Sequence, residues 1–167
     1  TLLELLVGSL RPDSGLVDRC PDARIAALTQ EVPHWNRQRT AAEIYSDHVR
    51  REGFSGAPGL TSTGLVDSSF AGQRVERMSL GQQRRLHLSL CLAGRPDLLI
   101  LDEPSNHLSF RLVDALTEAL ARADCAVIVS THDRQLLRDL SGWPTIHLDG
   151  TQVGSLHGTQ RPEIHCR

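Results

Sequence analysis

Two adjacent carboxylates, Asp102 and Glu103, follow the apolar run 98–101 and precede Pro104. A buried strand of a parallel sheet reads as such a run, and sheets of this kind place their chemistry at the carboxyl ends of the strands. Paired carboxylates there could hold a divalent cation and activate a water molecule. Taken alone, the pattern fits a core strand that ends in a solvated turn equally well.

A second apolar run covers residues 126–130, and Thr131, His132 and Asp133 follow it directly. Between the two runs, apolar residues recur at helical spacing: Leu108, Leu112, Val113, Leu116, Ala119 and Leu120. Strand, helix and strand in this order predict a parallel crossover unit. Polar residues then stand at both strand exits, which favours a site over a plain turn.

Upstream, residues 25–28 predict a short strand, after which Gln30 leaves the sheet. Two sequences have the form of a capping box, a hydroxyl followed three residues later by a carboxylate or amide. Thr40 and Glu43 predict a helix over about 41–51, and Ser79 and Gln82 begin an apolar helix that continues to Gly94.

Other local patterns predict the rest of the chain. Residues 1–10 suit a buried helix. Residues 53–64 are rich in glycine and suit a flexible connector within a smaller helical region, and a helix is expected over about 133–140. Asp149 and Gly150 between short alternating runs predict a hairpin.

Composition indicates a soluble, cytoplasmic globular chain. It has 167 residues, 40% apolar and 23% charged, and no apolar stretch or leader that suits a membrane span or a signal peptide. The net charge of −2 gives no general footprint for nucleic acid, and all 18 basic residues are arginine. A local basic cluster is interpreted as a solvated helix face rather than a phosphate-binding surface: Arg74, Arg77, Arg84 and Arg85.

Several reactive or aromatic residues lack the spacing of a site. The four cysteines are expected to be reduced thiols: Cys20, Cys91, Cys125 and Cys166. Six histidines are expected on the surface or in packing contacts: His34, His48, His87, His147, His157 and His165. Trp35 and Trp143 are expected to pack rather than stack on a base, and His107 to shape its loop.

In chain order, the motifs are Gln30 after a strand, the helix start 79–82, the strand end 98–103 and His132. Together they resemble the Q-loop, signature, Walker B strand and switch histidine of the ATP-binding cassette (ABC) family, over roughly residues 1–149. The resemblance implies an α/β fold, the P-loop NTPase nucleotide-binding domain of ABC type, with a mainly parallel sheet. It also implies a partial ABC domain over 1–150 with a small helical subdomain at about 36–80. A hairpin end and tail follow over 151–167.

The resemblance also assigns roles, with ATP and Mg²⁺ as cofactors. Glu103 and His132 are the expected catalytic residues, and Asp102 and Gln30 are expected to hold the metal. The residues expected to bind nucleotide are Thr1, Gln30, Ser79, Gly81 and Gln82. Because the signature of one cassette reaches the ATP of another, a second cassette is an expected partner, in the same polypeptide or in a dimer.

The loop after Pro104, residues 105–108, resembles that of the ABC-F branch. This implies ATP hydrolysis in a cytoplasmic two-cassette protein that acts on ribosomes, such as a translation or antibiotic-resistance factor. Leu80 and Ser109 depart from the family pattern. An ATP-binding subunit of a membrane transporter, partnered by a transmembrane subunit and not itself inserted, remains an alternative.

A second alternative is an inactive fragment. In the family, Thr-Leu-Leu follows the Gly-Lys-Ser or Gly-Lys-Thr of the phosphate-binding loop (Walker A), and here these residues are 1–3. The chain is therefore expected to start just after that loop and to lack the N-terminal strands. ATP binding by these residues alone should be impaired, because the loop amides and lysine hold the phosphates.

Overall fold

The computed structural model describes residues 1–106, 110–121, 123–149 and 152–153. Its centre is a parallel sheet of three strands, in the order β1 (Ile25–Leu28), β2 (Leu98–Asp102) and β3 (Ala126–Ser130). The central strand β2 is apolar and its middle residues are fully buried. The predicted strands are confirmed, and the α/β class with a parallel sheet follows from them.

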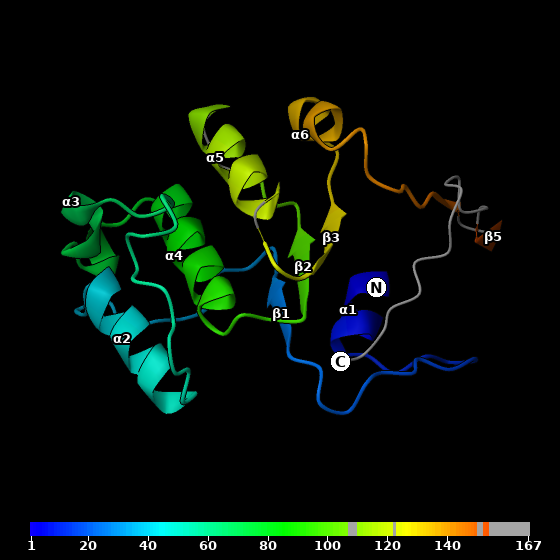
Figure 1. Ribbon diagram of the computed structural model, residues 1–167, viewed down its shortest axis with the longest axis horizontal. Helices are drawn as coiled ribbons and strands as arrows, with labels where there is room; N and C mark the ends of the chain where they lie inside the picture. Colours follow the sequence, from blue (N-terminus) through cyan, green and yellow to red (C-terminus); the bar gives the residue numbers. More distant parts are fainter. Residues whose placement is uncertain (107–109, 122, 150–151, 154–167) are drawn as a thin grey trace.

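Helices cover both sides of this sheet (Figure 1). The long helix α4 (Leu80–Ala93) contacts β1, whereas α1 (Leu2–Val7) contacts β1 and β2 from the other side. Helix α5 (Phe110–Ala121) connects β2 to β3, and α6 (Arg134–Asp139) follows β3 and contacts α5. The crossover from β2 through α5 to β3 is as predicted.

Helix α1 differs from its prediction. None of its residues is buried, and Leu2 is exposed. The helix has only six residues, less than two turns, with apolar side chains around most of its circumference. The sheet covers one side of it alone, so the expectation of a buried helix was wrong.

A smaller helical region lies beside α4, away from the sheet (Figure 1). It contains α2 (Ala41–Arg51), α3 (Ser68–Ala71) and the 3₁₀ helix η1 (Val75–Arg77). Residues 53–64 connect α2 to α3 and form neither helix nor strand, and the flexibility expected of them stays a prediction. Buried side chains of this region and of the sheet belong to one continuous apolar cluster, so α4 packs between them. The subdomain boundary at about 36–80 stays a prediction.

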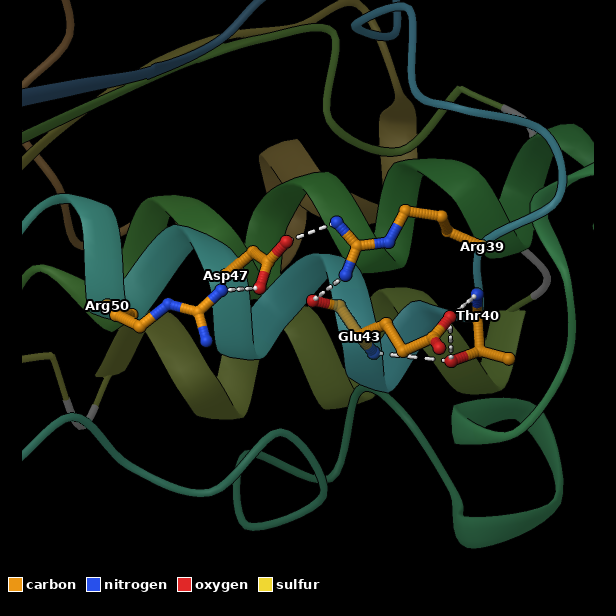
Figure 2. Close-up of polar contacts among 5 residues, drawn as sticks. All are labelled: Arg39, Thr40, Glu43, Asp47 and Arg50. Carbon is orange, nitrogen blue, oxygen red and sulfur yellow. Dashed lines mark hydrogen bonds and ion pairs between the residues drawn. The ribbon is translucent and has the colours of Figure 1, made fainter.

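Both predicted capping boxes are formed. The Thr40 hydroxyl accepts a hydrogen bond from the Glu43 amide at 3.2 Å, and the Glu43 carboxylate accepts from the Thr40 amide at 2.8 Å. Figure 2 shows this box at the start of α2, together with Asp47, which binds both Arg39 and Arg50. These contacts satisfy amides at the start of α2 and fix where the helix begins.

At the end of the described chain, β4 (Leu148–Asp149) pairs antiparallel with β5 (Gln152–Val153), as the hairpin prediction requires. Trp35 and Trp143 pack against the core, as expected. Several predictions concern residues outside the described ranges: His107, Leu108, Ser109, His157, His165, Cys166 and the tail over 154–167.

The three described cysteines are free thiols, and two of them, Cys91 and Cys125, pack against the apolar core. Burial raises the pKa of the Cys91 thiol to about 12. In the part of the chain that the structure covers, no helix is long and apolar enough to cross a bilayer.

Candidate functional site

Glu103 and His132 meet where β2 and β3 end. The Nδ1 atom of His132 lies 2.8 Å from Oε1 of Glu103. Asp102 is opposite Ser130 in the sheet register, and the Glu103 amide donates to the Ser130 carbonyl at 2.8 Å. The parallel pairing of β2 with β3 therefore brings the two predicted catalytic residues together, although 29 positions separate them.

The backbone of Glu103 is unusual. Its φ is +48°, in the left-handed region that non-glycine residues rarely adopt. The Glu103 carbonyl accepts from the Asn106 amide at 3.2 Å, which closes a tight turn after the strand. Such conformations cost of order 1–3 kcal/mol and concentrate at functional sites.

One oxygen of Glu103 has no partner. Oε1 faces His132, whereas Oε2 is buried and accepts no hydrogen bond from any described residue. A buried carboxylate oxygen is costly unless a donor or cation satisfies it. Oε2 is thus a buried acceptor that the described residues leave without a donor, and a water molecule would have to enter beside it to be activated by Glu103.

Arg84 organises the backbone of this site. Its side chain is 4% exposed and donates three hydrogen bonds, to the carbonyls of Gln30 at 2.7 Å, Glu103 at 3.0 Å and Asp102 at 3.3 Å. Burial lowers the pKa of the Arg84 guanidinium, while the nearby carboxylates of Asp102 and Glu103 raise it. One buried cation thus ties the ends of β1 and β2 to α4.

The prediction that the basic cluster forms a solvated helix face is wrong for Arg84, because this side chain is buried. Arg85 is half-buried, donates to the Leu65 carbonyl at 3.3 Å and lies 5.0 Å from the Phe70 ring centroid. Arg74 and Arg77 are exposed, as expected. A helical repeat of four residues places Arg84 on the same stripe as Leu88, which is buried, and this spacing could have indicated its burial.

The signature residues lie at the start of α4. Ser79 caps the helix: its hydroxyl accepts from the Gln82 amide at 3.2 Å, and the Gln82 side chain accepts from the Ser79 amide at 2.8 Å. The Gln82 side chain also donates to Gln73 at 3.1 Å. Ser79 is exposed and Gly81 half-buried. Helix α4 connects this group to Arg84, one turn further along.

The two remaining nucleotide-binding candidates are exposed. Gln30 follows β1, and its side chain faces outward while its carbonyl binds Arg84. Thr1 precedes α1, and its ammonium lies 3.2 Å from the Glu4 carboxylate. The structure thus brings Gln30, Asp102, Glu103 and His132 to one edge of the sheet.

The oxygen-bearing side chains of Asp102 and Gln30 suit Mg²⁺, which takes oxygen ligands and usually keeps several waters. Among the described residues, no three His, Cys, Asp or Glu side chains converge on a potential metal position. A site with one or two protein ligands, completed by water and substrate phosphate, fits this donor set better than a closed protein cage.

A pocket of about 380 Å³ lies between segment 32–37 and the residues that lead into α4, and none of the four residues at the sheet edge lines it. Met78 and Gln83 line it, as does Trp35, which contacts His87 edge to face with ring centroids 6.2 Å apart. His87 is buried, as a packing histidine would be, and desolvation is the main cause that lowers its pKa to about 4. The sequence did not predict this pocket.

Comparison with known proteins places these features in a family. The family model described as ABC transporter matches residues 1–106. The tylosin resistance ATP-binding protein of Streptomyces fradiae is 36% identical over 142 residues, which are 85% of this chain and 26% of that protein. A probable ATP-binding cassette sub-family F member 3 homologue of Encephalitozoon cuniculi is 34% identical over 134 residues, 80% of this chain and 23% of that protein.

The fold agrees with solved cassettes. The structure of a putative cobalt transport ATP-binding protein superposes with a TM-score of 0.71 at 16% identity, covering 93% of this chain and 62% of that one. The chain spans about a quarter of the length of the two curated relatives. It therefore belongs to the ABC family, as an ATP-binding cassette domain related to the F subfamily.

Proposed function

We propose that the chain supplies the water-activating part of an ATP-hydrolysing cassette, with Glu103 and His132 as its catalytic residues. The contact of 2.8 Å between His132 Nδ1 and Glu103 Oε1 is the observation that carries the proposal. Since an ionised carboxylate only accepts, Nδ1 carries the proton of this hydrogen bond. Oε2 of Glu103 is left to orient the attacking water and take its proton.

His132 is suited to reach the γ-phosphate. Its side chain is 81% exposed, although Nδ1 is held by Glu103. With Nδ1 on the carboxylate, Nε2 is the ring nitrogen left to contact a phosphate oxygen. Glu103 thereby both activates water and orients the histidine.

Asp102 and Gln30 would hold Mg²⁺. The ion would supply positive charge to the nucleotide phosphates during phosphoryl transfer. Asp102 precedes Glu103 in the chain, so one strand end supplies both the metal ligand and the base. Thr1 would contact the nucleotide bound to this cassette.

Ser79, Gly81 and Gln82 would bind the ATP held by a second cassette. Ser79 is exposed at the N-terminus of α4, a helix of 14 residues, where free amides and the helix dipole favour an anion. The partner cassette belongs to the same polypeptide or to a dimer.

The whole protein is proposed to be a cytoplasmic factor of the ABC-F type that acts on the ribosome, in translation or antibiotic resistance. Its similarity to the tylosin resistance protein and to the sub-family F homologue favours this over a transporter subunit. Sedimentation with 70S ribosomes in the presence of ATP tests it. Co-purification with a transmembrane subunit, and none with ribosomes, would support the transporter instead.

ATP turnover tests the catalytic assignment. The chain is extended at its N-terminus by the segment that precedes the aligned residues in the tylosin resistance protein; we refer to this protein as the loop-extended cassette. Glu103→Gln should lower its phosphate release by at least about 100-fold, the lower range for loss of a general base. Glu52→Gln, at the exposed end of α2, is the matched control and should leave turnover unchanged.

Retention of more than half the turnover by Glu103→Gln would reject Glu103 as the base. The unextended chain should release little phosphate, because none of its residues is a lysine and it has no Gly-Lys phosphate loop. Comparable turnover with and without the extension would instead show that these residues hold ATP unaided.

A further inference from the structure

The hydrogen bonds of Arg84 join three parts of the fold that are distant in sequence. Nη1 donates to the carbonyl of Gln30, 54 positions away, and Nη2 donates to the carbonyls of Asp102 and Glu103, 18 and 19 positions away. The Gln30 carbonyl lies two residues after the end of β1, whereas Asp102 is the last residue of β2 and Glu103 follows it. Arg84 itself lies in the second turn of α4.

A guanidinium is the group that suits this position. It presents several N–H donors in a fixed planar fork, so two nitrogens reach carbonyls on different strands at once. An ammonium is a compact, strongly hydrated charge on a flexible stem, and it cannot reproduce that fork. Arg84 is 4% exposed, and the three hydrogen bonds of Nη1 and Nη2 satisfy its terminal nitrogens, whereas Nε has no partner among the described residues.

The carbonyls that Arg84 binds lie on both sides of the Glu103 α-carbon. Holding the Asp102 and Glu103 carbonyls together limits rotation of the backbone that bears the Glu103 side chain. This is the residue whose φ is +48° and whose carboxylate meets His132. The strained turn is thus restrained at its main chain by Arg84, in addition to the side-chain contact with His132.

We propose that Arg84 is a positioning residue for ATP hydrolysis, which fixes Glu103 and Gln30 relative to α4. The inference rests on the proposed function, because it assigns Arg84 a role in the reaction at Glu103. Arg84 lies five residues after Ser79 on one continuous helix. Movement of the signature end of α4 therefore reaches the base of the same cassette through these three hydrogen bonds.

Arg84→Met and Arg84→Lys in the loop-extended cassette test this role. Arg84→Met should lower kcat between about 10- and 100-fold, the scale of an ångström-sized misplacement, with the KM for ATP changed by less than about three-fold. Arg84→Lys keeps the charge and the stem, so it should fold and regain a minor part of the loss. Arg85→Met is the matched control, because Arg85 is a half-buried arginine of α4 that also donates to a carbonyl. The kcat of this variant should stay near that of the parent.

A double-mutant cycle separates positioning from general stability. If Arg84 acts through Glu103, Arg84→Met should have little effect once Glu103 is already Gln. The double variant should hydrolyse ATP in a single turnover less than about two-fold more slowly than Glu103→Gln alone, because residues that act as one catalytic unit do not contribute additively. Amide exchange at Glu103 should also be faster in Arg84→Met than in Arg85→Met, since its hydrogen bond to Ser130 loses support.

Three results would overturn the proposal. These are equal kcat values for Arg84→Met and Arg85→Met, a full additive loss in the cycle, or loss of the folded state in both Arg84 variants by circular dichroism. The last would make Arg84 a general stability residue. Failure of the proposed function is distinguishable, because Glu103→Gln would then retain turnover whatever Arg84 does.

Discussion

His132 and Glu103 share a hydrogen bond of 2.8 Å but differ sharply in exposure, since the histidine side chain is 81% exposed and the glutamate 14%. The carboxylate is therefore fixed by the fold, and the imidazole is the accessible member of the pair. A ligand that arrives from solvent meets His132 first.

His132→Ala should lower turnover of the loop-extended cassette by about 100-fold, in the range for a lost group that transfers or orients a proton. Unfolding free energy should change by less than about 0.5 kcal/mol, because the side chain is mostly in solvent. Phosphate release and urea unfolding are the measurements. His147→Ala, also exposed, is the control, and equal turnover of the two variants would contradict a role for His132.

Thr40→Ala should destabilise the chain by about 1 kcal/mol, because it removes the hydroxyl that accepts from the Glu43 amide and starts α2. Ser46→Ala, at an exposed position inside α2, should be neutral or slightly stabilising. Urea unfolding of both variants compares the same chemical change at a cap and at a helix interior. Equal effects would show that the box contributes nothing.

His87 predicts a pH dependence of stability. Its pKa is about 4 in the folded chain and about 6.5 in the unfolded chain, so between these values only the unfolded state takes up a proton. Stability should therefore fall as pH drops from about 6.5 to 4, by at most about 3 kcal/mol, and this contribution should level off below pH 4. Urea unfolding across this range is the measurement.

Carboxylates also titrate in that window, so the variant His87→Leu serves as the reference. Its stability should depend less steeply on pH than that of the unchanged chain between pH 4 and 6.5. Parallel curves for the two proteins would contradict the assignment to His87.

Leu101→Ala should cost about 2–5 kcal/mol, because Leu101 is completely buried in the central strand and the change leaves a cavity. Leu137→Ala, 50% exposed on α6, should cost much less. Urea unfolding, fitted with one common dependence of free energy on denaturant concentration, compares the stabilities of the two variants. A loss below about 1 kcal/mol for Leu101→Ala would indicate that the sheet is not the stable core.

Elements with strong local signals were predictable from sequence. The strand over 98–102 is an apolar run with polar residues on both sides, and Thr40 and Ser79 are hydroxyls that bind amides three residues away. Each signal lies within a few residues of the structure that it predicts. The sequence did not predict α3 and η1. These helices have four and three residues, which is too short for a periodic apolar pattern to appear.

The candidate catalytic residues could be predicted from the sequence, but the hydrogen bonds of Arg84 that hold their backbone could not. Glu103 and His132 were identified from the order of motifs, and the strand pairing then brought them into contact. The prediction that Arg84 lies on a solvated helix face was wrong. Its acceptors are main-chain carbonyls, which every residue has and which no sequence pattern identifies, and they lie 18 to 54 positions away. The helical spacing to Leu88 could have indicated that Arg84 is buried, but only the tertiary structure shows which carbonyls it binds.

At Glu103, the residue that would best suit the backbone conformation differs from the residue that the proposed reaction needs. Glycine and asparagine tolerate that backbone conformation better than glutamate does, so either would relax the turn after β2. Neither has a carboxylate to offer a water molecule. A substitution that relaxed this turn would therefore stabilise the fold and remove the proposed base in the same step.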